Sequence, residues 1–437
     1  MLYRELSAPL TSQIEVTTEC NNRCPHCYNS WRQTDEADFT LTLDQTERIM
    51  AEIISAGVFR VVITGGEPLL QPDLVVKIVR SCAEAGIQCS INSNLALMND
   101  TVLDRIISAG PVSFLTSIAS SDPSNHDGHM GRKGAFVETI KGIAVLRERG
   151  ISFGANMVVT QRNANQVYET GCYVRELGAR AFTATKASPP MGCPDYSKIR
   201  PTPEQVRGSL DDLLRLKGEG FLVDALECYP LCFLEDLSKY EAFTRRNCSA
   251  GVTSASVGAN GMVRPCPHSV RTYGNVLEES LVTIFGRMTE WRTGELLPST
   301  CLECQHLPRC SGGCRCEAEY YGVITDMDPL ASVPESVRKV DVKAPNPVVV
   351  SDNDLVQVRP MVKHRLESFG SVLVIGTKTI LIDEDASKMV AMISDRPMKV
   401  WDLADKTGCD MQKCYQVIQR LLGDGFLVRI GRKEVKQ

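Results

Sequence analysis

The first half of the chain alternates short runs of β-branched and apolar residues with longer amphipathic stretches. Short apolar runs predict buried strands, and apolar residues that recur every three or four positions predict helices. The predicted strands are Ile14–Thr18, Val58–Gly65, Gln88–Asn94, Ser113–Ala119, Ile151–Thr160 and Ala181–Lys186. The first predicted helix begins at the capping-box spacing of Thr42 and Gln45 and ends at Gly57. The further predicted helices are Leu69–Ala85, Asn99–Ala109, Phe136–Arg149 and Asn165–Leu177.

Six strand–helix units in series predict a parallel sheet covered by helices, and hence an α/β partial barrel of six strands over residues 1–225. The active site of such a barrel lies at the carboxyl ends of its strands. The residues that carry the chemistry are therefore expected at the ends of the predicted strands.

The second half of the chain loses this periodicity. Residues 226–331 are rich in Gly, Pro and Cys and predict an irregular domain that needs metal to fold. Residues 332–355 predict a linker, and residues 356–437 a separate small domain. That domain combines a strand pair, three helices and a last strand into a winged-helix-like α+β shape; its predicted elements are Ser371–Gly376, Lys378–Ile382, Glu384–Ser394, Val400–Lys406, Asp410–Leu422 and Phe426–Ile430.

Composition adds one anomaly. The 437 residues carry a net charge of −5, which gives no case for a nucleic-acid or membrane partner. Neither a secretory signal nor an apolar run of roughly 18 residues is visible, so we expect a cytoplasmic protein. Eighteen cysteines are an unusually large number for a cytoplasmic protein. Because the cytoplasm is reducing, this number favours metal or cluster ligation over disulfides.

Three of these cysteines, Cys20, Cys24 and Cys27, follow the first predicted strand. Three thiolates leave one iron of a four-iron cubane open to a substrate ligand, whereas structural zinc sites usually have four paired ligands. The spacing CxxxCxxC resembles the signature of the radical S-adenosylmethionine (SAM) superfamily. Thr64–Pro68, which ends the second strand as TGGEP, resembles the motif that binds the methionine group of SAM in that family.

The resemblance implies a [4Fe–4S] cluster on Cys20, Cys24 and Cys27 that reductively cleaves SAM to a 5′-deoxyadenosyl radical. It implies SAM contacts from residues around the cluster and at the strand ends: His26, Tyr28, Gly65, Gly66, Glu67, Pro68, Asn92, Ser93, Asn94 and Ser117. The segment 126–136 resembles a family motif whose arginine position holds Met130 here, so Arg132 is the predicted contact to the SAM carboxylate.

A second group of cysteines resembles the SPASM extension of radical SAM peptide maturases, which holds up to two auxiliary [4Fe–4S] clusters. The resemblance assigns Cys248, Cys266 and Cys314 to one cluster, with Cys228 or Cys232 as its fourth ligand or none. Cys301, Cys304 and Cys310 belong to the other. Relatives have a last cysteine where this chain has Ala331, so Cys316 is the predicted substitute. Zinc on the four thiolates of residues 301–314 is the alternative. His268 and Cys193 are further candidates to face the substrate.

The last domain resembles the PqqD-like peptide-recognition element, which binds a leader peptide as an added strand. DNA binding is the alternative, but 14 Lys and Arg against 10 Asp and Glu in residues 356–437 is weak for it. The family resemblance, to PqqE-like and sulfatase-maturase-like enzymes, implies an oxidoreductase that modifies a ribosomally made peptide, forming a thioether, a carbon–carbon crosslink or another oxidation. It implies a flavodoxin or ferredoxin as electron donor. The rivals are a sulfatase-type protein or small-molecule radical SAM oxidase and an Fe–S winged-helix transcriptional sensor.

Overall fold

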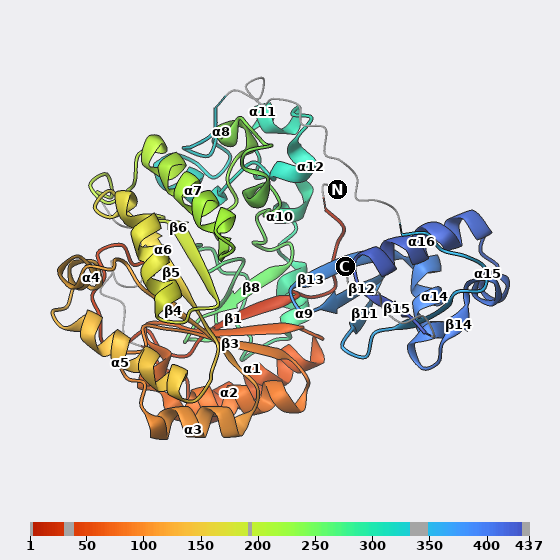
Figure 1. Ribbon diagram of the computed structural model, residues 1–437, viewed down its shortest axis with the longest axis horizontal. Helices are drawn as coiled ribbons and strands as arrows, with labels where there is room; N and C mark the ends of the chain where they lie inside the picture. The colour runs from red at the N-terminus through yellow and green to blue at the C-terminus, as the bar shows by residue number, and fades with distance from the viewer. Residues whose placement is uncertain (1–2, 30–38, 191–194, 333–347, 431–437) are drawn as a thin grey trace. The chain divides into compact units, whose positions relative to one another are not determined.

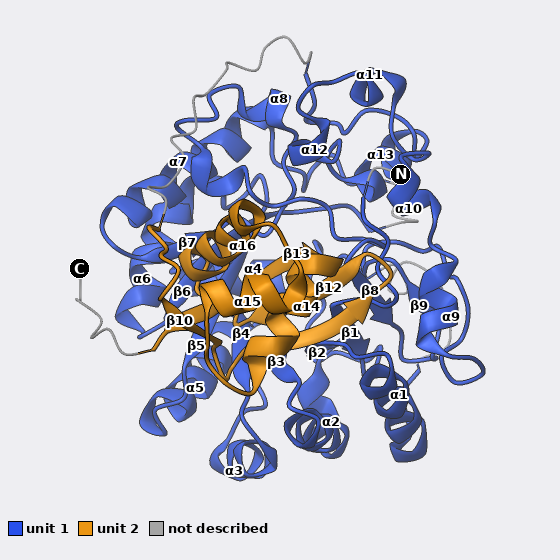
Figure 2. Ribbon diagram, turned by 90° about the vertical axis from the view of Figure 1, so that its right-hand side faces the viewer, with its two compact units in different colours: residues 1–340 blue, residues 341–437 orange. Residues whose placement is uncertain are grey.

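The structure is a computed structural model that describes residues 3–29, 39–190, 195–332 and 348–430. It divides into two compact units, residues 1–340 and 341–437, which are coloured separately in Figure 2. None of the helices in the described part of the chain combines the length and apolar character needed to span a membrane.

The first unit is built on a nine-stranded sheet in the order β7-β6-β5-β4-β3-β2-β1-β8-β9. All neighbouring strands are parallel except β8 and β9. The strands are β1 Thr11–Glu15, β2 Arg60–Thr64, β3 Gln88–Ser93, β4 Ser113–Ser117, β5 Phe153–Val159, β6 Ala181–Lys186, β7 Leu222–Asp224, β8 Ser254–Val257 and β9 Val263–Arg264. The predicted partial barrel is therefore confirmed.

Helices cover the outside of the barrel, as Figure 1 shows. They are α1 Leu43–Ser55, α2 Pro72–Glu84, α3 Asp100–Ala109, α4 Pro123–Met130, α5 Ala135–Glu148, α6 Val167–Glu176 and α7 Pro203–Gly218. The capping box at Thr42 and Gln45 is present, with both reciprocal hydrogen bonds. Helix α1 fits the sheet because its buried residues, among them Ile49, Met50 and Ile53, lie on one face.

The sheet has nine strands where six were predicted, because β7, β8 and β9 were not expected. Three further differences concern this unit. Strand β1 ends at Glu15 instead of Thr18, because after the last ladder hydrogen bond, from the Val16 amide to the Thr64 carbonyl at 3.0 Å, Thr17 pairs with Thr40 in an isolated bridge. Helix α7 was not predicted, although Thr202 and Gln205 form a second capping box before it. Helix α4 was not predicted either, because its sequence PSNHDGHM carries no apolar stripe.

The irregular cysteine-rich region packs into the same unit as the barrel. Its elements are short: α8 Leu231–Leu234, α9 Leu281–Gly286, α10 Glu290–Thr293, α11 Ser299–Leu302, α12 Leu307–Cys310 and α13 Arg315–Tyr321. Strand β8 extends the barrel sheet by pairing with β1, and the carboxylate of Glu15 on β1 lies 2.5 Å from the guanidinium of Arg264 on β9. Both side chains are buried, so an ion pair joins the two regions beneath the sheet.

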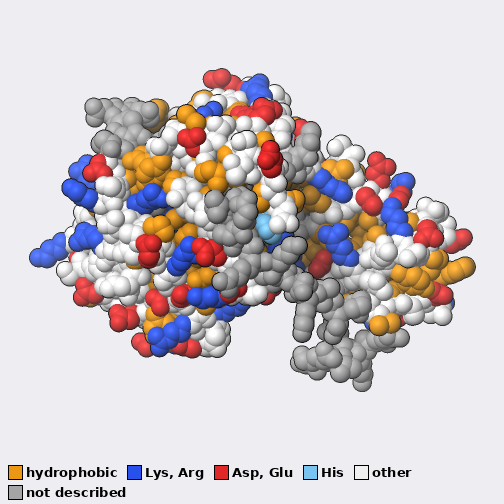
Figure 3. All heavy atoms as spheres, turned by 90° about the horizontal axis from the view of Figure 1, so that it is seen from above, with side chains coloured by type: hydrophobic (Ala, Val, Ile, Leu, Met, Phe, Trp, Pro, Cys, Tyr) orange, Lys and Arg blue, Asp and Glu red, His pale blue; other side chains and the backbone are white. Residues whose placement is uncertain are grey.

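The second unit has two small antiparallel sheets and three helices. One sheet has the order β14-β10-β15 and the other β11-β12-β13. The elements are β10 Leu355–Val358, β11 Lys363–Glu367, β12 Gly370–Ile375, β13 Lys378–Asp383, α14 Glu384–Ser394, β14 Met398–Lys399, α15 Val400–Thr407, α16 Met411–Gly423 and β15 Leu427–Arg429. The core of this unit includes the buried residues Cys414, Ile418 and Leu421 of α16. Over the face drawn in Figure 3, basic and acidic side chains are interspersed and do not gather by sign.

Candidate active site

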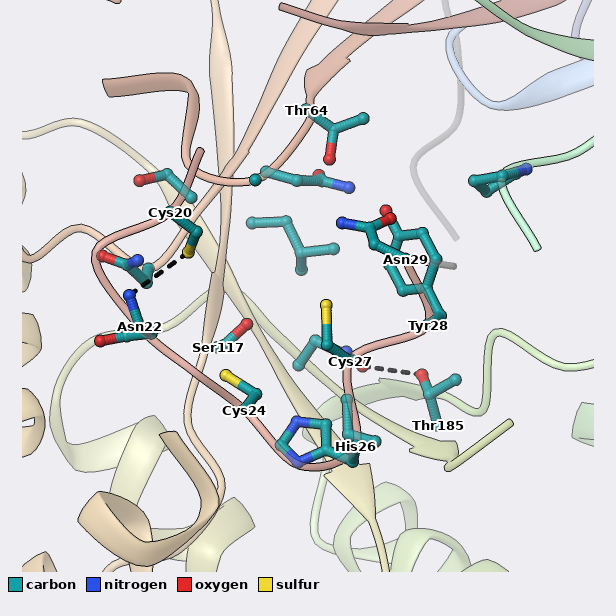
Figure 4. Close-up of a pocket in the computed structure, with 18 of the residues that line it drawn as sticks. Cys20, Asn22, Cys24, His26, Cys27, Tyr28, Asn29, Thr64, Ser117 and Thr185 are labelled. Carbon is teal, nitrogen blue, oxygen red and sulfur yellow. Dashed lines mark hydrogen bonds between the residues drawn. The ribbon is translucent and has the colours of Figure 1, made fainter. Parts of the chain in front are cut away.

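The three cysteines of the first loop surround one cavity at the carboxyl ends of the barrel strands. Cys20, Cys24 and Cys27 all line this cavity of about 350 Å³, and Figure 4 shows their thiols pointing into one space. The Cys24 thiol lies 3.7 Å from the sulfur of Met130, at the end of α4. The loop therefore presents its three thiols together.

Gly65 and Gly66 hold the cysteine loop against the end of β2. The Gly66 amide donates to the Thr17 carbonyl at 2.7 Å, and a Cβ on Gly66 would lie 2.0 Å from the Glu19 carbonyl oxygen. A Cβ on Gly65 would lie 2.4 Å from the Thr17 carbonyl oxygen. The glycines therefore admit the backbone of the cysteine loop, in addition to the ligand that the sequence predicted.

Glu67 fastens the ends of neighbouring strands to each other. One carboxylate oxygen accepts from the Leu69 amide at 3.0 Å and the Ser93 hydroxyl at 2.7 Å, and the other accepts from the Asn94 amide at 2.9 Å. The Asn94 side chain in turn donates to the Asn21 side chain at 2.7 Å, next to Cys20. Burial raises the pKa of Glu67, although the three hydrogen bonds oppose this shift. Glu67 thus controls the position of the cysteine loop through Asn94.

Most of the other predicted SAM contacts also line the cavity. They are His26, Tyr28, Gly65, Gly66, Glu67, Asn92, Ser93, Asn94 and Ser117. Burial, followed by the nearby His129 and His126, lowers the pKa of His26 to about 3, so this imidazole is neutral at physiological pH. The Tyr28 ring stacks on His268 with ring centroids 4.7 Å apart. His268 therefore faces the cavity as expected, whereas Cys193 lies outside the described residues.

Two predicted contacts do not line the cavity. Pro68 starts a short 3₁₀ helix, Pro68–Leu70, beyond the strand end. The Arg132 guanidinium donates to the Asn22 side chain at 2.8 Å and to Glu138 at 2.6 Å, and Met130 lines the cavity instead. Arg132 therefore contacts the cysteine loop through the side chain of Asn22.

The cavity fits a cluster with an open iron and a polar organic ligand. Three thiols on one side supply an incomplete ligand set for a four-iron cubane. Two buried polar atoms of the lining, the Asn29 side-chain oxygen and the Thr116 hydroxyl, have no hydrogen-bond partner among the described residues. Such orphaned groups inside a cavity fit a ligand that supplies the missing bonds.

The sequence missed several polar residues that line the far part of the cavity, including Asn156, Lys186 and Glu227. Lys186, the last residue of β6, forms a buried ion pair with Glu317 on α13. The Ser188 hydroxyl donates to the same Glu317 oxygen at 2.8 Å. The position of Lys186 at the end of β6 was a signal that could have indicated this residue, whereas Asn156 lies in the middle of β5 and Glu227 lies after β7.

The auxiliary cysteines form two groups. In the first, Cys228 contacts Cys248, the Cys266 and Cys316 sulfurs lie 3.6 Å apart, and Cys316 also contacts Cys314. The second group lines a separate small cavity and consists of Cys232, Cys301, Cys304 and Cys310. This corrects the prediction for Cys316, which follows Cys314 on the start of α13 and is carried with it into the first group.

The two groups differ from a mononuclear site. Among the described residues, no three Cys, His, Asp or Glu side chains converge on a point where a single ion would bind. A cubane takes its thiolates at separate corners, so its ligands surround a space. The geometry fits clusters of that kind.

Comparison with known proteins defines the class. Residues 14–170 match the model of the radical SAM superfamily, and residues 248–305 match SPASM, an iron–sulfur cluster-binding domain. The chain therefore contains a radical SAM domain followed by a SPASM domain, and it is an enzyme of the radical SAM type. Its cofactors are S-adenosyl-L-methionine and [4Fe–4S] clusters.

Individual relatives are distant. The chain is 27% identical to an AdoMet-dependent heme synthase of Methanosarcina barkeri over 73% of this chain and 94% of that protein. It is 26% identical to a PqqA peptide cyclase of Gluconobacter oxydans over 75% of this chain and 91% of that protein. The solved structure of Streptococcus suis SuiB bound to precursor peptide SuiA superposes with a TM-score of 0.62 at 21% identity, covering 75% of this chain and 77% of SuiB, and it supports the fold.

Proposed function

We propose that this enzyme modifies a ribosomally synthesised peptide by radical chemistry and that its C-terminal unit binds the leader of that peptide. The modification of the peptide is a thioether, a carbon–carbon crosslink or another oxidation. A PqqA peptide cyclase among the relatives acts, by its name, on a peptide, and the architecture shared with SuiB is compatible with a peptide substrate.

The observation that carries the proposal is the sheet β11-β12-β13 of the C-terminal unit. Within the described chain, β13 is an outer strand of this sheet and pairs with β12. An extended peptide can add to an outer strand over residues 378–382, because the backbone groups at a sheet edge supply regular hydrogen bonds. The inner side chains, such as Leu373 and Ile380, are buried in the core of the unit, which makes the edge rigid.

The heme synthase relative favours a second candidate, a small-molecule substrate. That relative is matched over 94% of its length by only 73% of this chain, so about a quarter of this chain has no counterpart in it. The C-terminal unit, residues 341–437, is of similar extent. The PqqA peptide cyclase leaves a similar share of this chain unmatched, so the preference for a peptide substrate rests on the sheet edge of the C-terminal unit.

In this proposal, different residues of the cavity hold the cluster and bind SAM. The thiols of Cys20, Cys24 and Cys27 would hold the first cluster, and SAM would bond to the polar atoms of Asn29 and Thr116 that have no partner within the described ranges. When bound, the cluster and SAM supply a one-electron route to removing a hydrogen atom from the substrate. A flavodoxin or ferredoxin would supply the electron.

Other polar residues of the cavity would orient the peptide. Lys186, Glu227 and His268 line the cavity and offer an amine, a carboxyl group and an imidazole. Burial lowers the pKa of His268 to about 4, so its imidazole is neutral at physiological pH and stacks on Tyr28. These groups can bind backbone amides and polar side chains of a peptide.

The test compares the full chain with one lacking residues 356–437, using as substrates the short peptides encoded by any open reading frames next to the gene. We expect SAM cleavage without peptide to be equal in both, and peptide modification, followed by mass spectrometry, to fall at least tenfold in the shortened chain. A synthetic leader added in excess should inhibit only the full chain. Equal peptide modification by both chains would refute leader binding by the C-terminal unit.

A further inference from the structure

The second auxiliary group holds a complete set of four thiols without Cys316. Cys232, Cys301, Cys304 and Cys310 all line one small cavity, together with apolar residues such as Leu307. Four cysteines are what a fully ligated [4Fe–4S] cluster requires. The sequence alone assigned only three of them to this group.

The position of the missing cysteine faces the same cavity. Ala331 is part of its lining. The turn before it is anchored by Asp328, whose carboxylate accepts from the Cys314 amide at 2.6 Å and from the Leu330 amide at 2.8 Å. The Ala331 amide donates to the Asp328 carbonyl at 2.7 Å. A cysteine at residue 331 would therefore have offered its thiol to the cavity that Cys232 lines.

Cys232 is held at this cavity by contacts on both sides. It lies on α8, and the amide of the preceding Leu231 donates to the Cys310 sulfur at 3.4 Å. The Ser332 hydroxyl donates to the Cys232 carbonyl at 2.7 Å, which ties α8 to the residue after Ala331. The chain from α8 and the chain after the Asp328 turn thus meet at one corner of the cavity.

Cys228 is only four residues from Cys232 but belongs to the other group, where it contacts Cys248. Pro230 separates them with φ −57° and ψ 131°, an extended conformation just before α8 begins. The two cysteines therefore do not lie on one helical face, and each can serve a different group.

We propose that Cys232 is the fourth ligand of the second auxiliary cluster, with Cys301, Cys304 and Cys310, and that it occupies the corner left vacant at Ala331. Cys316 has no part in this cluster. With four thiolates, the second cluster has no open iron and acts by electron transfer, not by binding substrate. This assignment concerns the cofactor alone and holds whatever the substrate is.

The test uses the full chain with the three cysteines of the first loop changed to Ala, so that only auxiliary clusters are loaded. Two cubanes give about eight irons per chain. We expect Cys232→Ala to reduce iron by up to half and to give the electron paramagnetic resonance signal of a [3Fe–4S] cluster after mild oxidation. Adding Ala331→Cys should restore the iron content and remove the signal.

Cys316→Ala is the matched control, and Ala331→Cys should not change its iron content. Rescue of Cys316→Ala by Ala331→Cys, or full iron without a [3Fe–4S] signal in Cys232→Ala, would overturn the assignment.

A second measurement needs no change at Cys232. In the loaded protein, we expect alkylation of Cys232 to be at least tenfold slower than alkylation of Cys409, a partly exposed cysteine of the C-terminal unit. Removal of iron with a chelator should abolish that protection. Equal labelling of Cys232 and Cys409 in the loaded protein would also overturn the assignment.

Discussion

Glu67 is expected to support SAM binding without touching the reacting atoms. Replacing it with Ala removes the acceptor for the buried amides of Leu69 and Asn94 and for the Ser93 hydroxyl. An unsatisfied buried donor costs about 1–3 kcal/mol, so the two amides alone cost about 2–6 kcal/mol. Asn94 then loses its fixed position, and with it the hydrogen bond to Asn21 in the cysteine loop.

Glu67→Gln separates shape from charge. The amide keeps one oxygen for Leu69 and Ser93 and turns its NH₂ toward the Asn94 amide, which leaves one orphaned donor and a cost of about 1–3 kcal/mol. Because burial raises the pKa of Glu67, the neutral side chain also avoids the cost of burying a charge. We therefore expect the lower end of this range, a loss of SAM affinity of about 5–10-fold.

The assay is equilibrium binding of SAM to the reconstituted enzyme without oxygen, with iron content measured in parallel. For Glu67→Ala we expect at least a 30-fold loss of affinity (about 2 kcal/mol). Glu84→Gln, an exposed position at the end of α2, is the control and should bind SAM normally. SAM affinity within twofold of the original in Glu67→Ala would refute this role.

Three further predictions concern packing and charge. Gly66→Ala places a Cβ 2.0 Å from a backbone oxygen of the cysteine loop, so the variant should not assemble the first cluster and should contain about four fewer irons per chain. Gly208→Ala is the control, because a Cβ there has no atom within 4 Å, and this variant should keep its full iron content. Burial lowers the pKa of His126 to about 4 in the folded state. Between about pH 4 and pH 6.5, His126 is therefore protonated in the unfolded state but not in the folded state. The free energy of unfolding should fall by about 1.4 kcal/mol at pH 5.5, and a pH series of melting temperatures should show this slope reduced in His126→Asn. Lys186→Met leaves Glu317 buried without its partner and should cost about 3–5 kcal/mol, most of it recovered on adding Glu317→Gln; equal melting temperatures would contradict this.

The parts of the molecule that follow from local sequence were predictable. The cysteine spacing after β1 and the glycines after β2 mark strand ends, and alternation of strands and helices predicts a parallel sheet. Helix α7 was equally predictable from its capping box and the buried Val206, Leu210 and Leu213, but it was overlooked.

Contacts between distant segments were not predictable. Lys186 and Glu317 are 131 residues apart, and the local sequence around either residue does not predict that they form an ion pair. The grouping of the auxiliary cysteines likewise depends on where α8 and α13 return in space, which spacing along the chain does not encode. Cys316 was assigned by its availability in the sequence, whereas its helix carries it to Cys266.

The pairing of β1 with β8 has a consequence for the redox centres. Strand β1 leads directly into the loop of Cys20, and the antiparallel turn from β8 to β9 leads to Cys266. Neighbouring strands lie about 4.8 Å apart, and the Glu15–Arg264 ion pair joins β1 to β9, the strand that follows β8. We therefore expect strand pairing to set the interval that an electron crosses between the first and the auxiliary centres.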